Sequence, residues 1–122
     1  MSESDRRYQR YFISEGAFKS QRIKGSSFIG TLKGWMDCQI RDLSYAGAQV
    51  YSNAKLGLGA KIEIKLTSDQ GKEMNFKGEV VNIGRDLATS QQKLGVRIEE
   101  PAVGSKEANF LGDLSENFEK SF

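Results

Sequence analysis

The run over residues 60–66 constrains the fold more than any other stretch of the chain. It reads AKIEIKL, so that Ile62, Ile64 and Leu66 alternate with charged residues. Successive side chains of a strand point to opposite faces, and a period of two therefore creates one buried and one hydrated face. The run predicts an amphipathic β-strand that packs on a core.

Several other short runs predict strands separated by local turns. Residues 67–73 have the polar and glycine residues of a tight turn, and 74–83 predict the return strand of an antiparallel hairpin. A polar loop is expected over 84–93. The remaining strands are expected over 11–23 (interrupted near Gly16), 36–43, 47–52 and 93–100. The pattern indicates a mainly β fold, either a barrel or a sandwich.

The pattern changes after Pro101, where the sequence predicts a C-terminal helix over 103–120. Ser105 is the expected N-cap, and Glu107 falls in the first turn, where a carboxylate interacts favourably with the helix dipole. Gly112 argues against a fully continuous helix. The apolar residues that share one face are Val103, Phe110, Leu111, Leu114 and Phe118. This face is expected to pack on the β-domain or on a second subunit, which leaves a homo-oligomer open.

The length of the chain fits a single domain over residues 1–122. We divide it into an N-terminal arm (1–12), the β-domain (13–100) and the C-terminal helix (103–120). No apolar run approaches the ~20 residues of a membrane helix, and the polar N-terminus lacks the hydrophobic region of a signal peptide. We therefore expect a cytoplasmic protein that does not bind a membrane.

The residue types that are missing exclude several chemistries. The chain has no histidine, so that neither a Ser-His-Asp triad nor a histidine-containing zinc site can form. Cys38 is the single cysteine, and its neighbours predict a buried strand position with no activating base. No glycine-rich nucleotide fingerprint is present. We expect a protein without enzymatic activity, metal or cofactor.

The first candidate binding motif is DRRYQR, residues 5–10, which contains Arg6, Arg7 and Arg10. A guanidinium can bind two phosphate oxygens at once, or donate to O6 and N7 of guanine. Residues 1–98 carry a net charge of +6 and 99–122 carry −4, so that the basic part suits an anionic ligand. A solvated N-terminal arm is the simpler alternative.

The second candidate motif is DLSYAG, residues 42–47, between two expected strands. The carboxylate of Asp42 is complementary to the N1–H and N2 amino donors of guanine, and the Ser44 hydroxyl can donate to a phosphate. Gly47 has no side chain, so that a flat ligand can approach closely. The same three residue types are also typical of a plain turn.

The order and spacing of the two motifs resemble the PilZ-domain family of bacterial cyclic di-GMP receptors. R-x-x-x-R precedes the first strand, and D-x-S-x-x-G follows about thirty residues later between two strands. LGLGAKIEIKL and KLGVRIEE also resemble family strands, so that the similarity covers most of residues 5–100. The resemblance implies a six- or seven-stranded antiparallel β-barrel with a C-terminal helix and a flexible N-terminal arm. It implies ligand-binding roles for Arg6, Arg7, Arg10, Asp42, Ser44 and Gly47.

The resemblance also implies a function in second-messenger signalling of the kind that controls motility and biofilm formation. Cyclic di-GMP would order the arm against the barrel and so create a surface for an unidentified effector protein. One alternative is a PilZ adaptor that binds only proteins. A less favoured one is an OB-like barrel that binds nucleic acid.

Overall fold

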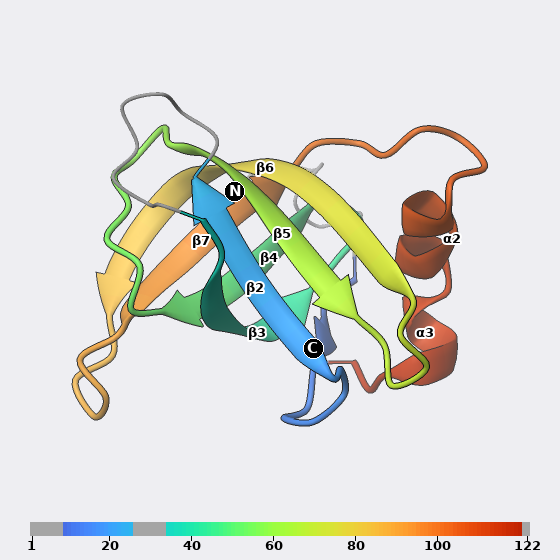
Figure 1. The fold of residues 1–122 in the computed structure, drawn as a ribbon, viewed down its shortest axis with the longest axis horizontal. Helices are drawn as coiled ribbons and strands as arrows, with labels where there is room; N and C mark the ends of the chain where they lie inside the picture. The colour runs from blue at the N-terminus through green and yellow to red at the C-terminus, as the bar shows by residue number, and fades with distance from the viewer. Residues whose placement is uncertain (1–8, 26–33, 121–122) are drawn as a thin grey trace.

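The computed structural model describes residues 9–25 and 34–120, and Figure 1 shows their arrangement. The strands are β1 (Tyr11–Phe12), β2 (Ser20–Gly25), β3 (Met36–Leu43), β4 (Gly47–Ser52), β5 (Lys61–Thr67), β6 (Glu73–Arg85) and β7 (Gln92–Ile98). Two short helices follow, α2 (Lys106–Gly112) and α3 (Leu114–Asn117). The mainly β fold is confirmed.

Six of the strands close into an antiparallel barrel. The order is β1-β3-β2-β5-β6-β7-β4, and an additional pairing of β3 with β4 closes the sheet. The start of β3 pairs with β2, where Arg22 lies opposite Asp37, and its end pairs with β1, where Phe12 lies opposite Asp42. β1 is therefore an extra strand beside the barrel, added at the end of β3 that carries the second motif.

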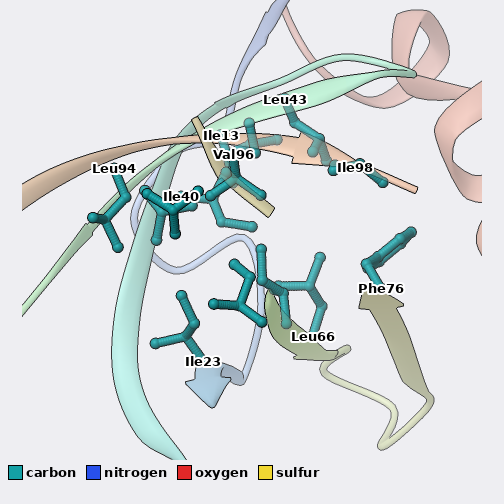
Figure 2. Packing of buried hydrophobic residues seen from close by; sticks show 14 of the residues in the cluster. Ile13, Ile23, Ile40, Leu43, Leu66, Phe76, Leu94, Val96 and Ile98 are labelled. Carbon is teal, nitrogen blue, oxygen red and sulfur yellow. The ribbon is translucent and has the colours of Figure 1, made fainter. Parts of the chain in front are cut away.

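The alternating run predicted the face of β5 correctly. Ile62, Ile64 and Leu66 are almost completely buried. They belong to one core inside the barrel, which Figure 2 shows from close by. Burying such side chains stabilises the fold by about 1.5–3 kcal/mol each.

Two β-bulges let the longer strands curve around this core. The pairing of β3 with β4 shifts between Ile40 and Asp42, and that of β6 with β7 shifts between Val80 and Asn82. An extra residue bends a strand and increases its twist, as closing a barrel requires. In β6 the buried residues before the shift lie at even positions (Met74, Phe76 and Val80), whereas after it Ile83 is the residue that packs against the core.

Two expected boundaries in the β-domain were wrong. Residues 11–23 are interrupted near Gly16 as expected, where φ is 83°, but the interruption separates two strands: both pair with β3, and β2, which continues to Gly25, also pairs with β5. The loop expected over 84–93 is shorter, because β6 continues to Arg85 and β7 begins at Gln92. Asp86 holds this tight turn, since its carboxylate accepts from the Ala88 N–H and the Thr89 hydroxyl.

The bounds expected for the C-terminal helix, 103–120, were also wrong, whereas the interruption that Gly112 indicated is present. Ser105 is the N-cap, as expected, and its hydroxyl accepts from the Ala108 N–H at 3.1 Å. The helix ends after Gly112, a residue of low helix propensity, and Asp113 separates α2 from α3. Val103 precedes the helix and is fully exposed, so that it does not share the apolar face.

The apolar face of the two helices packs on the barrel. Leu111 and Leu114 are buried in its core, and Glu107 accepts a hydrogen bond from the Asn75 N–H of β6 at 2.9 Å. The Phe110 ring lies 5.8 Å from that of Phe18, centroid to centroid. Of the two partners expected for this face, the structure places it against the barrel.

Candidate functional site

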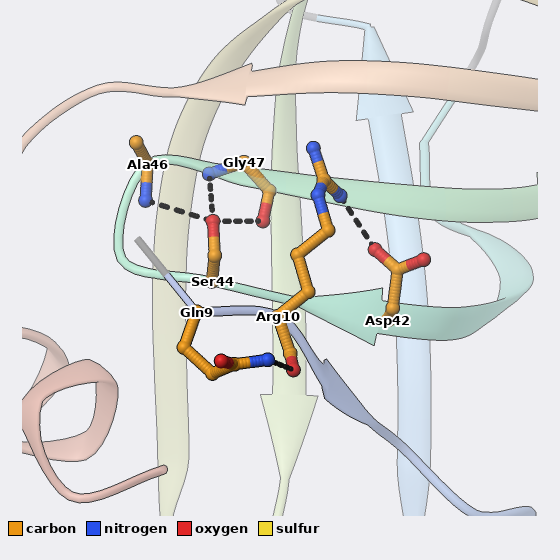
Figure 3. A network of polar contacts seen from close by, with 6 residues as sticks. All are labelled: Gln9, Arg10, Asp42, Ser44, Ala46 and Gly47. Carbon is orange, nitrogen blue, oxygen red and sulfur yellow. Dashed lines mark hydrogen bonds and ion pairs between the residues drawn. The ribbon is translucent and has the colours of Figure 1, made fainter. Parts of the chain in front are cut away.

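The pairing of β1 with β3 brings Arg10 beside Asp42, a residue 32 positions later in the chain. Arg10 Nη1 donates to Asp42 Oδ1 at 2.6 Å, and Figure 3 shows the pair on the outside of the barrel. The Arg10 side chain is 47% exposed and that of Asp42 18%. The arginine side of the pair is half exposed and the aspartate side mostly covered, and an ion pair near the surface contributes on the order of 1 kcal/mol. Both groups can therefore exchange this contact for a charged ligand at small cost.

Ser44 lies in the turn between β3 and β4 and is buried. Its Oγ donates to the Gly47 carbonyl at 3.3 Å and accepts from the N–H groups of Gly47 and Ala46 at 3.0 and 3.2 Å. These bonds hold the turn that follows Asp42 (Figure 3). The hydroxyl is thus engaged within the chain, and its contact with a ligand remains a prediction.

Gly47 begins β4 directly beside the Arg10 guanidinium. A Cβ at this position would lie 3.1 Å from the Val96 carbonyl oxygen and 3.6 Å from Arg10 Nη2. Gly47 does not have a positive φ, so that its backbone does not demand glycine. The tight contact of an added Cβ would be with the Val96 carbonyl of β7, whereas its contact with the guanidinium would be an ordinary one. Glycine thus allows the close approach of β4 to β7 and leaves room beside Arg10.

The other two arginines of the first motif, Arg6 and Arg7, lie outside the described residues. Their binding roles remain predictions. The structure therefore brings together Arg10, Asp42, Ser44 and Gly47 out of the six candidate residues.

A row of charges that the sequence analysis missed ends at Gly47. Arg97 is the cross-strand partner of Gly47 on β7, and Glu79 on β6 lies opposite both Arg97 and Lys61. Glu79 Oε1 accepts from Arg97 Nη2 at 2.7 Å and from Lys61 Nζ at 3.2 Å. The hydrogen bond from Lys61 and then that from Arg97 lower the pKa of the Glu79 carboxyl below its ordinary value. The three charged residues lie on three different strands, so that only the strand register reveals the row.

The lowered pKa of Glu79 predicts a small dependence of stability on pH. A carboxyl whose pKa is lower in the folded state stabilises the fold above its unfolded pKa of ~4.3, and this contribution is lost as pH falls through the folded value. We expect acidification below about pH 5 to lower the urea midpoint more for the parent than for Glu79→Gln. Urea titrations at several pH values would measure the midpoints of both proteins. If the midpoint fell equally with pH in the parent and in Glu79→Gln, the lowered pKa of Glu79 would be contradicted.

Another unexpected contact lies on the edge of β1 that faces away from β3. The Phe12 N–H donates to the Glu119 carbonyl at 2.9 Å, and Tyr11 forms a bridge with Lys120. The strand that follows Arg10 is thus held between β3 and the segment after α3.

Other candidate chemistry in the described part of the chain is limited. Burial, and then the charge of Asp37, raise the pKa of the Cys38 thiol to about 12, which keeps it protonated at neutral pH. Residues 9–25 and 34–120 contain no cluster of acidic and cysteine side chains suited to a metal ion. No helix in these ranges is long and apolar enough to span a membrane.

Comparison with protein families identifies the family to which a chain with this barrel and these two motifs belongs. A family model described as "PilZ domain" matches residues 4–110, a range that contains both motifs. The chain belongs to the PilZ-domain family. PilZ domains form a family of cyclic di-GMP-binding domains that act as receptors or adaptors.

The PilZ fold is also found among solved structures. The structure of the Bacillus subtilis inhibitor of motility (MotI/DgrA) matches with a TM-score of 0.61 and 14% sequence identity. The match covers 90% of this chain and 51% of the other, so that this chain spans about half the length of that protein. No curated protein sequence matches.

Proposed function

We propose that this PilZ domain is a receptor that binds cyclic di-GMP on the outer face of the barrel, where β1, β3 and β4 meet. The observation that carries the proposal is the partly exposed Arg10–Asp42 pair beside the side-chain-free position of Gly47. Arg6 and Arg7 would extend the site from the preceding arm.

The chemistry of the pair suits the two parts of this ligand. A guanidinium binds phosphate oxygens or the O6 and N7 acceptors of guanine, and a carboxylate accepts from the N1–H and N2 donors. The two side chains now satisfy each other, and the ligand would replace this single contact by several. Ser44 supports the site mainly by shaping the turn that presents Asp42.

The output of binding would be a changed protein surface. Arg10 directly precedes β1, and β1 also contacts Glu119 and Lys120. A ligand that repositions Arg10 and the arm would therefore alter the surface that β1 shares with the C-terminal segment, where an effector protein can bind. Control of motility is one output of this kind, since the Bacillus neighbour is named an inhibitor of motility.

Titration calorimetry tests the proposal directly. We expect cyclic di-GMP to release or absorb heat with a defined stoichiometry, and GMP to bind much more weakly because it offers one base and one phosphate. Absence of binding to the folded protein would favour the protein-binding adaptor instead. Preferential binding of oligonucleotides, with steep salt dependence, would instead favour nucleic-acid binding by this PilZ domain.

A further inference from the structure

A groove runs along the outside of the barrel from β1 to the turn between β6 and β7. Its volume is about 540 Å³, within the range of about 300–1,000 Å³ that is typical of small-molecule sites. Residues 12–15 form one wall, β3 and β4 form the floor, and the turn around Thr89 forms the far end. Arg41 and Tyr51 point into it from the two floor strands.

Tyr51 lies in this groove between two cations. The Arg41 Cζ is 5.1 Å and the Lys93 Nζ 5.9 Å from the centre of its ring. Gln39 and Lys93 are the cross-strand partners of Tyr51 on β3 and β7. Arg41 is exposed at the bulge of β3 and forms no ion pair with a carboxylate of the described residues. The groove thus presents an aromatic ring and a guanidinium that forms no ion pair with a described carboxylate, and the Lys93 ammonium lies beside the ring. Two acids, Glu15 and Asp86, also line the groove, and the Asp86 carboxylate accepts hydrogen bonds within its own turn.

The groove adjoins the Arg10–Asp42 pair. Arg41 directly precedes Asp42, and Phe12, which lines the groove, is the cross-strand partner of Asp42 on β1. On the other side Asp42 lies opposite Gln49, and Tyr51 follows two residues later on the same face, roughly 7 Å along β4. One dinucleotide is long enough to contact both places.

We propose that Tyr51 and Arg41 form the stacking surface for a second nucleobase of the bound dinucleotide. This inference rests on the proposed function and adds a second contact region to it. Aromatic rings and guanidinium planes stack on any nucleobase, and nearby cations favour an anionic backbone. Asp42 and Arg10 would contact the edge of one guanine, while Tyr51 and Arg41 would stack on the other.

Substitutions at Tyr51 separate ring stacking from simple packing. Loss of one stacked base weakens binding roughly five- to 150-fold, which we expect in Tyr51→Leu, because leucine covers the strand but has no ring face. Tyr51→Phe keeps the ring and should bind within about twofold of the parent. The matched control is Trp35→Leu, since Lys24 and Lys65 lie 4.9 and 4.6 Å from the Trp35 ring in the same kind of arrangement over β2 and β5.

Calorimetry with cyclic di-GMP gives the affinities, and thermal melts confirm that each variant is folded. In the parent complex, nuclear Overhauser effects between guanine H8 and the Tyr51 ring protons are expected. The second base site would be overturned if Tyr51→Leu bound cyclic di-GMP as tightly as the parent, or if Trp35→Leu lost as much affinity as Tyr51→Leu. A saturated complex without these nuclear Overhauser effects would also overturn it. A folded parent that does not bind cyclic di-GMP would instead reject the proposed function, and this inference with it.

Discussion

The Asp42→Ala variant is expected to bind cyclic di-GMP roughly 10- to 150-fold more weakly than the parent, because a hydrogen bond to a charged group contributes about 1.5–3 kcal/mol. Arg10→Ala should weaken binding by a similar factor. The effect on stability should be smaller, on the order of 1 kcal/mol, since Arg10 is half exposed and ion pairs near the surface contribute little. Titration calorimetry and urea unfolding of the same preparations measure the two effects.

The barrel offers a matched control for these two variants. Arg22 and Asp37 form another exposed ion pair, at 3.4 Å between β2 and β3. Arg22→Ala removes the same functional group from the surface and should leave binding within about twofold of the parent. If Arg10→Ala and Asp42→Ala bind as tightly as Arg22→Ala, the site assignment is wrong even though the family assignment stands.

Local sequence patterns predicted those parts of the fold in which apolar and polar side chains alternate regularly along the whole strand. The alternation in β5 identified its buried face, and the turn around Gly71, whose φ is +85°, led directly into β6. The same reasoning fails at the bulge after Val80, where one extra residue reverses the faces of the strand. Whether a strand has a bulge depends on the curvature of the closed barrel, and no single strand contains that information.

The candidate site shows the same division between local and tertiary information. Asp42 and Gly47 belong to one turn, and the resemblance of the two motifs to the PilZ-domain family led to Arg10 as a member of the same site. The engagement of Ser44 within the turn depends on the folded turn geometry. The cations around Tyr51 come from different strands, and only the register of β4 between β3 and β7 brings them together.

The largest effect on stability is expected from Gly78→Ala in β6. A Cβ at Gly78 would lie 2.6 Å from the Arg97 carbonyl oxygen and 2.8 Å from Val96 Cγ1, so that the backbone of β7 must move. Overpacking of this kind costs about 1–3 kcal/mol and more where backbone has to shift. We expect a clearly lower urea midpoint, and also weaker binding of cyclic di-GMP, because Arg97 pairs with Gly47 at the candidate site.

Gly84→Ala in the same strand is the control that isolates this steric cause. The nearest atom to a Cβ at Gly84 is the Lys93 Cβ at 3.8 Å, an ordinary contact. Neither glycine has a positive φ, so that alanine at position 84 should be neutral or stabilise by about 0.4–1 kcal/mol through the unfolded state. Equal urea midpoints for Gly78→Ala and Gly84→Ala would show that the backbone of β7 can shift beside residue 78 without loss of stability. The register that places Gly47 opposite Arg97 would then tolerate movement, and the open space beside Arg10 would not depend on a rigid barrel wall.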